Sequence, residues 1–470
     1  MKYDTVIGLE VHCELKTETK CFCSCRNKFG DKPNTNCCPV CLGFPGALPV
    51  LNKKAVEYAV IAGLAFNCSI NNESVFERKN YFYPDLSKAY QISQLEKPLC
   101  INGYVPITVN GVEKRIRLNR IHLEEDAGKL IHDGVSGTVV DYNRGGVPLI
   151  EIVTEPDITS ADEAVAFLET LRNTIAYTGI SDVKMEEGSL RCDVNLSVKP
   201  AGSEVLGTRT EMKNLNSFKA VHRAIEYEQK RQIEEIEDGH RIIQETLKWD
   251  DQLGESRSMR SKEDSQDYRY FPDPDLLPVY ISDEQIKALK DSLPKLPRQL
   301  KQEYMSYGLS DYDASLLTES KSISDYFNLT LSYINQPKLV ANYIINEVLR
   351  KLKEDNNNKI DAKNLAELLI LIDKKEISST AGKQVFEEMW NTGKTANQLV
   401  DSMGLRQVNN DDELKNYVLS AIEQFPQSVL DYKSGKTSAV GFLVGQVMRA
   451  SHGKANPQRV NEMLKEELDK

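Results

Sequence analysis

Arg191-Cys192-Asp193-Val194-Asn195-Leu196-Ser197-Val198 decides the fold of the N-terminal part of this chain, because polar and apolar residues alternate in it at every step. Such alternation is typical of a β-strand that buries one face and leaves the other in water. Residues 208–213 continue the pattern, and residues 7–15 repeat it, with an apolar face opposite one that carries Glu10 and His12. We therefore predict an antiparallel sheet with one packed and one solvated face.

Two helices are expected to interrupt the strands. The first opens with the capping pattern Ser160-Ala161-Asp162-Glu163, runs to about Tyr177 and stops at Gly179. The second begins after Asn216-Ser217 and runs to about Glu237.

The length of 470 residues indicates two to four domains, since one domain takes roughly 150 residues. Only three of the 18 prolines follow Pro297, so we expect loops and strands before that residue and helices after it. Residues 292–297 have the composition of a linker. These features predict an α+β protein with an N-terminal domain over residues 1–292 and an all-helical part beyond it.

The net charge of −11, from 59 basic and 70 acidic side chains, argues against a protein coated with basic charge for bulk nucleic-acid binding. A local basic stretch remains, since residues 436–459 contain Lys436, Arg449, Lys454 and Arg459 and no acidic residue. No apolar run approaches the roughly 20 residues of a membrane helix, and no signal-peptide pattern opens the chain. We therefore expect a cytoplasmic protein without a membrane partner.

Six of the ten cysteines fall between Cys21 and Cys41. Two close pairs, Cys23 with Cys25 and Cys38 with Cys41, match a tetrahedral zinc site with four sulfur ligands and a structural role. The alternative is a set of disulfides or free thiols, but stable disulfides are rare in the cytosol. Cys21 and Cys37 are extra thiols beside the pairs, and either could compete as a ligand.

Carboxylates and histidines gather on the solvated faces of the expected strands. Glu10 and His12 are two residues apart, so their side chains leave the same face about 7 Å apart. Glu151 lies in an otherwise apolar strand, where an acid is costly to bury without a partner. Further acidic groups on polar segments are those of residues 122–129, Asp193 and Glu211. Oxygen and imidazole ligands suit Mg²⁺ or Mn²⁺, which in turn holds phosphate oxygens. The alternative for each single residue is ordinary surface charge.

Two more segments offer partners for phosphate. Arg144-Gly145-Gly146 combines a cation with glycines that let the backbone approach a ligand closely, and residues 79–85 mix a cation, aromatic side chains and a turn. An ordinary turn is the alternative for both. A complete phosphate loop, a dinucleotide fingerprint and a nucleophile elbow are all absent from the sequence. A reaction would therefore depend on metal ions and electrostatics rather than on a covalent nucleophile.

Several long strings resemble those of one family. They begin with Val6-Ile7-Gly8-Leu9-Glu10-Val11-His12 and continue through residues 78–85, 122–129, 148–152, 184–193, 213–217, 267–272 and 441–446. With these strings the chain is similar, over essentially its whole length, to the B subunit of bacterial aspartyl/glutamyl-tRNA(Asn/Gln) amidotransferase, the GatB family.

The resemblance implies a heterotrimer in which an amidase (glutaminase) partner releases ammonia from glutamine and a small third protein completes the complex. The B subunit would use ATP and Mg²⁺ to phosphorylate the side-chain carboxylate of misacylated Glu-tRNA(Gln) or Asp-tRNA(Asn). Ammonia arriving through an internal channel would then displace the phosphate. The resemblance also implies a cradle-like N-terminal domain, which carries the zinc loop 21–41. A helical domain over residues 299–405 and a YqeY-like tail over residues 406–470 would follow it and contact tRNA.

Roles for single residues also follow from the resemblance. The side chains expected at the reaction centre are Glu125, Lys79, Tyr81, Glu10 and His12, with Lys79 and Tyr81 near the channel exit. One Mg²⁺ would be held by His12, Glu125 and Glu151, and a second would lie near Glu10, Asp193 and Glu211. The ATP phosphates would contact Arg144, Gly145, Gly146 and Arg191. Zinc would bind Cys23, Cys25, Cys38 and Cys41, and the tRNA would meet Lys436, Arg449, Lys454 and Arg459.

Two alternatives stand beside this interpretation. A non-catalytic, zinc-stabilised tRNA-binding scaffold is favoured only if the acidic groups are surface charge. An archaeal-type relative that acts on Glu-tRNA(Gln) alone usually carries an extra inserted domain. The short passage from residues 272–278 to the linker leaves no room for such a domain.

Overall fold

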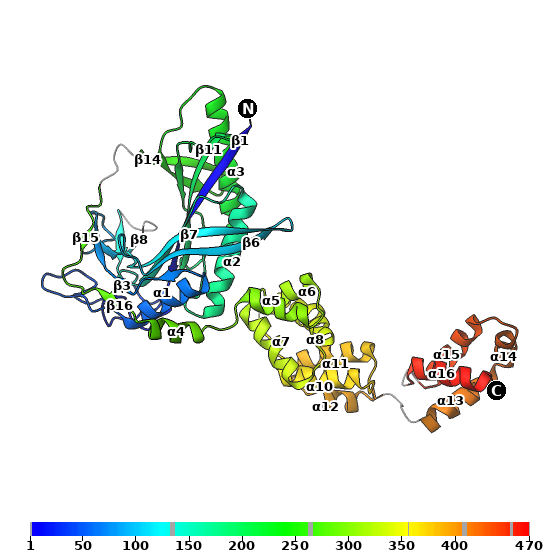
Figure 1. Cartoon of the computed structure of the whole chain (residues 1–470). Coiled ribbons are helices and arrows are strands. Elements are labelled where there is room, and N and C mark those ends of the chain that lie inside the picture. Colours follow the sequence, from blue (N-terminus) through cyan, green and yellow to red (C-terminus); the bar gives the residue numbers. More distant parts are fainter. Residues whose placement is uncertain are drawn as a thin grey trace. The chain divides into compact units, whose positions relative to one another are not determined.

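The computed structural model describes residues 2–131, 137–261, 267–355, 357–406, 411–451 and 455–469, without the side chains of residues 260 and 261. The chain divides into two compact units, Met1–Pro297 and Arg298–Lys470 (Figure 1). The first unit combines sheets with helices and the second is helical, so the α+β class expected from the sequence is confirmed.

A nine-stranded sheet forms the first unit, in the order β14-β13-β12-β11-β1-β10-β7-β6-β2. Its central strands β1, β10 and β11 include the segments in which polar and apolar residues alternate. The strands are β1 (Tyr3–Glu14), β2 (Ser69–Ile70), β6 (Cys100–Val109), β7 (Val112–Glu125), β10 (Pro148–Thr154), β11 (Leu190–Pro200), β12 (Thr210–Lys213), β13 (Glu245–Asp250) and β14 (Glu255–Ser261).

One pair of strands departs from the expected antiparallel sheet, because β12 and β13 run parallel. A parallel return needs a long crossover connection, and the chain supplies one in helix α3 (Phe218–Glu237), which lies between these two strands in sequence. The other neighbouring pairs of this sheet are antiparallel.

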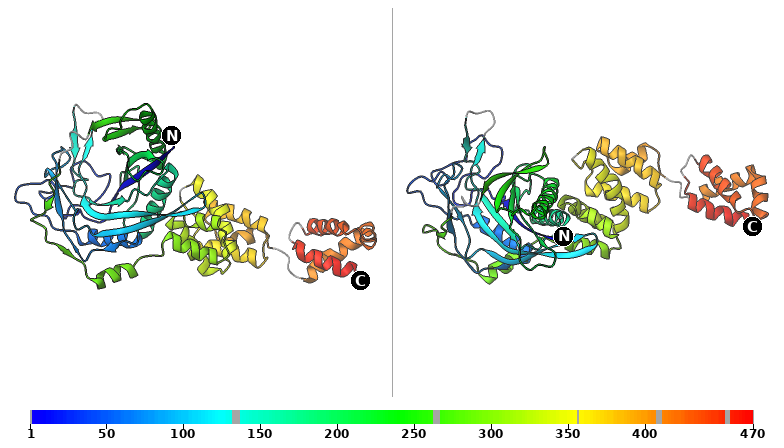
Figure 2. Two further views of the ribbon diagram at one scale, coloured as in Figure 1. Left: turned by 45° about the horizontal axis from the view of Figure 1, so that its top comes forward. Right: turned by 90° about the horizontal axis from the view of Figure 1, so that it is seen from above.

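Three helices, α1 (Lys53–Ala65), α2 (Ala161–Thr178) and α3, pack on the sheet and bury its apolar face (Figure 2). Ile7, Leu9 and Val11 of β1 are almost fully buried there, and each such side chain contributes about 1.5–3 kcal/mol to folding. Both expected helices are confirmed. Ser160 caps α2 by accepting a hydrogen bond from the Glu163 backbone N–H, and Ser217 caps α3 in the same way through Ala220.

Gly179 ends α2 with a φ of 73°, a left-handed conformation that glycine adopts without a steric penalty. The unit is completed by short strands and one helix at the edges of the sheet. These are β3 (Glu73–Ser74), β4 (Glu77–Asn80), β5 (Tyr90–Ser93), β8 (Lys129–Ile131), β9 (Val139–Asp141), β15 (Phe271–Pro272), β16 (Val279–Tyr280) and α4 (Asp283–Asp291).

Helices make up the second unit in the part of it that the structure describes. The helices α13 to α16 enclose an apolar core of their own, which includes Leu414, Leu443 and Leu464. The elements are α5 (Pro297–Ser306), α6 (Asp311–Leu317), α7 (Lys321–Tyr333), α8 (Pro337–Tyr343), the π-helical turn η2 (Ile344–Val348), α9 (Leu349–Glu354), α10 (Ala362–Asp373), α11 (Ser379–Thr392), α12 (Ala396–Ser402), α13 (Asp411–Gln424), α14 (Pro426–Lys433), α15 (Ser438–Ala450) and α16 (Pro457–Leu468).

Candidate functional site

A row of three ionisable side chains crosses the polar face of the large sheet. His12 of β1 is paired with Glu151 of β10, which is in turn paired with His122 of β7. Residues directly opposite one another in neighbouring antiparallel strands place their side chains on the same face. Both imidazoles therefore approach one carboxylate, with the Glu151 Oε2 atom 3.6 Å from His12 Nε2 and 3.4 Å from His122 Nε2.

Glu124 completes this group. It follows His122 by two residues on β7, so it shares the same face, and its Oε1 lies 3.9 Å from His12 Nε2. Although burial alone would lower the pKa of His122, the neighbouring Glu151 and Glu124 raise it to about 9. Ligand atoms of His12, Glu124 and Glu151 lie within 4.8 Å of one another, which is compact enough to hold one cation.

Glu125 lies apart from this group, which corrects the expectation that it joins His12 and Glu151. Successive residues of a strand point to opposite faces, so Glu125 and Glu124 diverge. The Glu125 carboxylate pairs with the Lys88 ammonium and accepts a hydrogen bond of 3.0 Å from the Ile92 backbone N–H. The spacing of His122 and Glu124, which equals that of Glu10 and His12, is the sequence signal that identifies Glu124 instead.

A second acidic group lies on the same face, one strand further along the sheet. Glu10 is paired with Asp193 across β1 and β11, and ligand atoms of Glu10, Asp193 and Glu211 lie within 4.8 Å of one another. Burial and the neighbouring carboxylates, Glu151 first among them, raise the pKa of Glu10. The Lys213 ammonium sits between two members of this group, 2.7 Å from Asp193 Oδ2 and 2.9 Å from Glu211 Oε1.

Both groups open into one cavity of about 340 Å³. Its wall also carries cations and phenols, so a bound ligand can meet charges of both signs. These lining side chains are Lys79, Arg120, Arg209, Lys213, Tyr268 and Tyr270. A sequence search confined to acidic clusters misses most of them, although Arg209 and Lys213 alternate with Glu211 on one strand face and 267–272 is among the family strings.

Lys79 lies in this wall, and Tyr81 stands beside it. The Lys79 ammonium is 4.9 Å from the centre of the Tyr268 ring, and the Tyr81 ring packs edge-on against Tyr268 at 5.9 Å. The segment that carries Tyr268 is held by β4, because the Asn80 backbone N–H donates to the Tyr268 carbonyl at 2.9 Å. Although burial would lower the pKa of Lys79, Glu124 and other neighbours raise it, so the side chain stays a cation.

A second cavity, of about 410 Å³, adjoins the first. The two share Glu10, Asn195, Arg209 and Gln244 as lining residues. The rest of its wall is largely uncharged and comes from β1, β10 and the segment 206–208. These residues are Val6, Gly8, Leu9, Val153, Thr154, Pro156, Ser197, Leu206, Gly207 and Thr208.

Arg144 and Arg191, expected at the ATP phosphates, flank the buried Asp126 instead of lining these two cavities. Arg191 Nη2 lies 2.8 Å from Asp126 Oδ2, and Arg144 Nε lies 3.7 Å from it and donates to the Ala127 carbonyl. Burial would raise the pKa of Asp126, but the two arginines outweigh it and lower the pKa to about 2. Gly145 and Gly146 belong to the same turn and line neither cavity.

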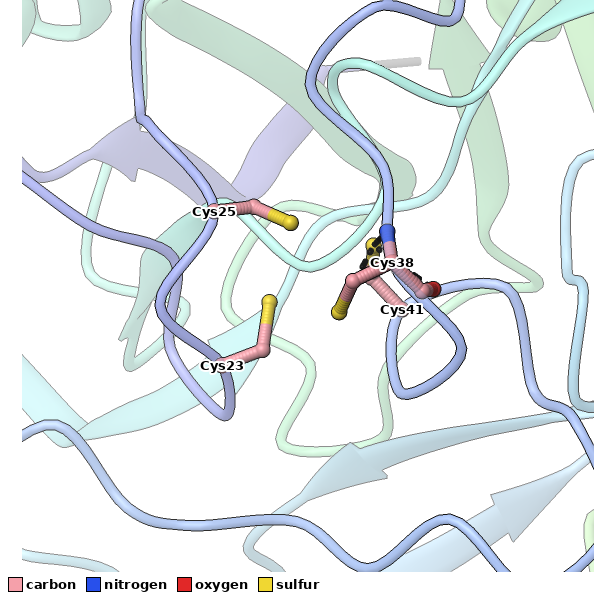
Figure 3. Close-up of side chains that lie close together, drawn as sticks. All are labelled: Cys23, Cys25, Cys38 and Cys41. Carbon is pink, nitrogen blue, oxygen red and sulfur yellow. Dashed lines mark hydrogen bonds between the residues drawn. The ribbon is translucent and has the colours of Figure 1, made fainter.

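The four cysteines of the predicted zinc site converge from two turns of the loop 21–41 (Figure 3). Their sulfur atoms lie within 4.8 Å of one another, and the Cys38 backbone N–H donates to the Cys41 sulfur at 3.2 Å. A hydrogen bond from Cys23, with smaller contributions from Cys38 and Lys20, lowers the pKa of Cys41 to about 4. Four thiols in this arrangement fit Zn²⁺, which prefers tetrahedral thiolate ligands.

Cys21 and Cys37 lie outside this group of four. Cys21 is buried in the apolar core, and burial raises the pKa of its thiol well above the usual value. The Cys37 sulfur contacts the Asn143 side-chain oxygen at 3.9 Å. The described cysteines are all free thiols, so the disulfide alternative receives no support from the geometry.

In the second unit, two of the four predicted tRNA contacts already form ion pairs. Lys436 lies 3.2 Å from Asp431, and Arg459 lies 2.8 Å from Asp411 and 3.3 Å from Glu462. Arg449 stands in the last turn of α15, and Lys454 lies outside the described residues. Among the helices described, none is both long and apolar enough to span a bilayer.

The fold and the site together define an enzyme subunit with a chelating α+β catalytic unit and a helical unit. The family model of the GatB/GatE catalytic domain matches residues 5–287, and that of the GatB domain matches residues 325–468. Aspartyl/glutamyl-tRNA(Asn/Gln) amidotransferase subunits B from Caldicellulosiruptor bescii, Thermoanaerobacter pseudethanolicus and Persephonella marina are 56%, 54% and 52% identical to it, each over 100% of both chains. The chain belongs to this family of amidotransferase B subunits, as its sequence strings predicted.

Proposed function

We propose that this chain is the ATP- and Mg²⁺-dependent subunit that amidates misacylated Glu-tRNA(Gln), Asp-tRNA(Asn) or both. The names of its relatives support the substrates, since they are aspartyl/glutamyl-tRNA(Asn/Gln) amidotransferases. One observation of the structure carries the proposal: two cation-binding groups and four cationic side chains share a single cavity. Phosphoryl transfer needs this combination of metal ligands and fixed positive charge.

The chemistry explains why ATP is needed. A carboxylate is a poor acyl electrophile, so the γ-phosphoryl group of ATP passes to a side-chain carboxylate oxygen and ADP leaves. Ammonia then attacks the acyl carbon, inorganic phosphate leaves, and the nitrogen loses a proton. When bound, Mg²⁺ neutralises phosphate charge and aligns the phosphoryl group for transfer.

The residues of the chain have distinct tasks in this proposal. His12, Glu124 and Glu151 hold the first Mg²⁺, and Glu10, Asp193 and Glu211 adjoin the second. Lys79, Arg120, Arg209 and Lys213 are the cations that meet phosphate, a task that the family resemblance assigned to Arg144 and Arg191. The second cavity, which is largely uncharged and joins the first at Glu10 and Arg209, takes the nucleoside part of ATP.

Ammonia delivery involves the partners. We propose a heterotrimer with an amidase that hydrolyses glutamine and a small third protein, and a channel whose exit lies near Lys79 and Tyr81. Glu125 takes the proton that ammonium must lose. Its buried carboxylate, fixed by Lys88 and the Ile92 N–H, is separate from the Mg²⁺ ligands and therefore free for this role.

The helical domain, residues 299–405, and the tail, residues 406–470, are proposed to bind tRNA. The separate apolar core of α13 to α16 supports a distinct tail domain.

Joint charge reversal, Lys436→Glu with Arg449→Glu, is expected to raise the Michaelis constant for aminoacyl-tRNA about 10-fold and to change kcat less, because phosphate contacts position the RNA. Lys465→Glu, an exposed lysine of α16 outside the basic stretch, is the matched control. If the double variant binds tRNA with the same salt dependence as the wild type, these cations do not contact phosphate.

Reconstitution tests the whole proposal. The chain is combined with its two partner proteins, glutamine, ATP and each misacylated tRNA, and the amino acid recovered from the tRNA is identified. Glutamine or asparagine must form only when ATP is present. Product formation without this chain, or none with it, would instead favour the zinc-stabilised scaffold that binds tRNA without catalysis.

A further inference from the structure

Lys20 is a buried lysine next to the cysteine site. Its side chain is fully buried, which is rare for a lysine without a partner of opposite charge. The residue directly precedes the loop 21–41, and its backbone N–H donates to the Cys25 carbonyl at 2.9 Å. The Lys20 ammonium is therefore fixed by the turn that carries two of the four cysteines.

The contacts of this ammonium identify its counter-charge. Lys20 Nζ lies 3.6 Å from the Cys41 sulfur and 3.0 Å from the Tyr142 carbonyl oxygen. A carbonyl is neutral, so the sulfur is the one of these two acceptors that can carry a negative charge. Because a buried cation without an anion is very costly, the contact favours Cys41 as a thiolate.

A tetrathiolate zinc centre needs such a cation. Zn²⁺ with four thiolates carries a net charge of about −2, and groups that hydrogen-bond to the ligands tune the stability of a metal site. Lys20 supplies one positive charge and one hydrogen bond at the most buried of the four sulfurs.

The same side chain joins the cysteine loop to a second segment, residues 141–147. Lys20 reaches it at Tyr142, Cys21 donates from its backbone N–H to the Gly146 carbonyl at 2.8 Å, and the Asn36 N–H donates to Asn143 Oδ1 at 2.8 Å. A Cβ atom at Gly146 would lie 3.5 Å from both the Lys20 and the Cys41 side chains. The two segments are thus packed closely around the ammonium.

We propose that Lys20 is the internal counter-cation of the cysteine zinc site, and that it fastens the metal-bound loop 21–41 to the segment 141–147. Lys20 is a positioning residue in this proposal. The inference depends on the zinc assignment but not on the amidation reaction, so metal analysis of the wild-type chain separates its failure from that of the proposed function.

The test compares Lys20→Met and Lys20→Gln with Lys28→Met in the full-length chain. Lys28 lies in the same loop but is half-exposed and 3.6 Å from Asp31, so it is a matched control. The first measurement is the rate at which a chromophoric chelator removes zinc. The second is the sulfur-to-metal charge-transfer band after replacement of zinc by Co²⁺. The third is amide hydrogen exchange of residues 141–147 in the zinc-loaded protein.

Loss of the charge in Lys20→Met is expected to speed zinc release about 10-fold or more, within the range for groups that hydrogen-bond to metal ligands. The Co²⁺ band should move to longer wavelength, because a sulfur without a hydrogen bond donates more readily, and residues 141–147 should exchange faster. Lys20→Gln keeps donors but not the charge, so it should also release zinc faster. Wild-type release from Lys20→Gln overturns the proposal, even if Lys20→Met fails to fold.

Discussion

Replacing His12 with alanine is expected to lower ATP-dependent amidation of misacylated tRNA by about 1000-fold or more. The reason is geometric: His12 is the member of its group that touches both carboxylates, at 3.6 Å from Glu151 and 3.9 Å from Glu124. Without the imidazole, two buried acids face each other with one ligand fewer for the cation. Glutamine hydrolysis by the amidase partner should remain measurable, because that chemistry belongs to another protein.

The measurement is product formation per enzyme in the reconstituted complex, with glutamate release from glutamine followed in parallel. His240→Ala is the matched control, because this histidine is exposed and pairs with Glu235, away from the cavity. Wild-type amidation in His12→Ala would eliminate the metal assignment.

A pair of neighbouring substitutions distinguishes the structure from the sequence-based expectation. Glu124→Gln should weaken Mn²⁺ binding, followed by electron paramagnetic resonance, about 10-fold or more, since a ligand carboxylate is lost. Glu125→Gln should leave Mn²⁺ binding close to that of the wild type, because Lys88 and Ile92 hold this side chain elsewhere. The reverse order of effects would restore Glu125 as the ligand.

Loss of zinc is the second large effect that we expect. The purified wild-type chain should contain about one zinc ion, and Cys38→Ser should contain almost none, because a closed site requires all four sulfurs. Metal binding free energy contributes to folding, so the unfolding midpoint of Cys38→Ser should fall by about 5 °C or more.

Cys37→Ser is an unusually close control, because the adjacent cysteine lies outside the group of four. It should retain both the metal and the wild-type midpoint. The measurements are elemental analysis of protein purified under reducing conditions without chelator, and thermal unfolding followed by circular dichroism. A wild-type chain without zinc, or equal zinc in the two variants, would remove this site.

Local sequence signals predicted much of the fold. The alternation at 191–198 and the caps at Ser160 and Ser217 identified strands and helices that the structure contains. The parallel pairing of β12 with β13 was missed, because alternation fixes the faces of a strand but not its neighbour or its direction.

The sequence by itself determined the alternating strands, the capped helices, the two cysteine pairs and the family. Each of these is a pattern of nearby residues, and short-range geometry is enough to interpret it. Only the tertiary structure decided that Glu124 rather than Glu125 faces His12, since this depends on the register of β7 against β10. It also decided that Arg144 and Arg191 are occupied by Asp126, whereas Arg209 and Lys213 line the cavity. The physical reason is that a charge acts on whatever lies within a few ångströms of it, and folding brings those neighbours from distant parts of the chain.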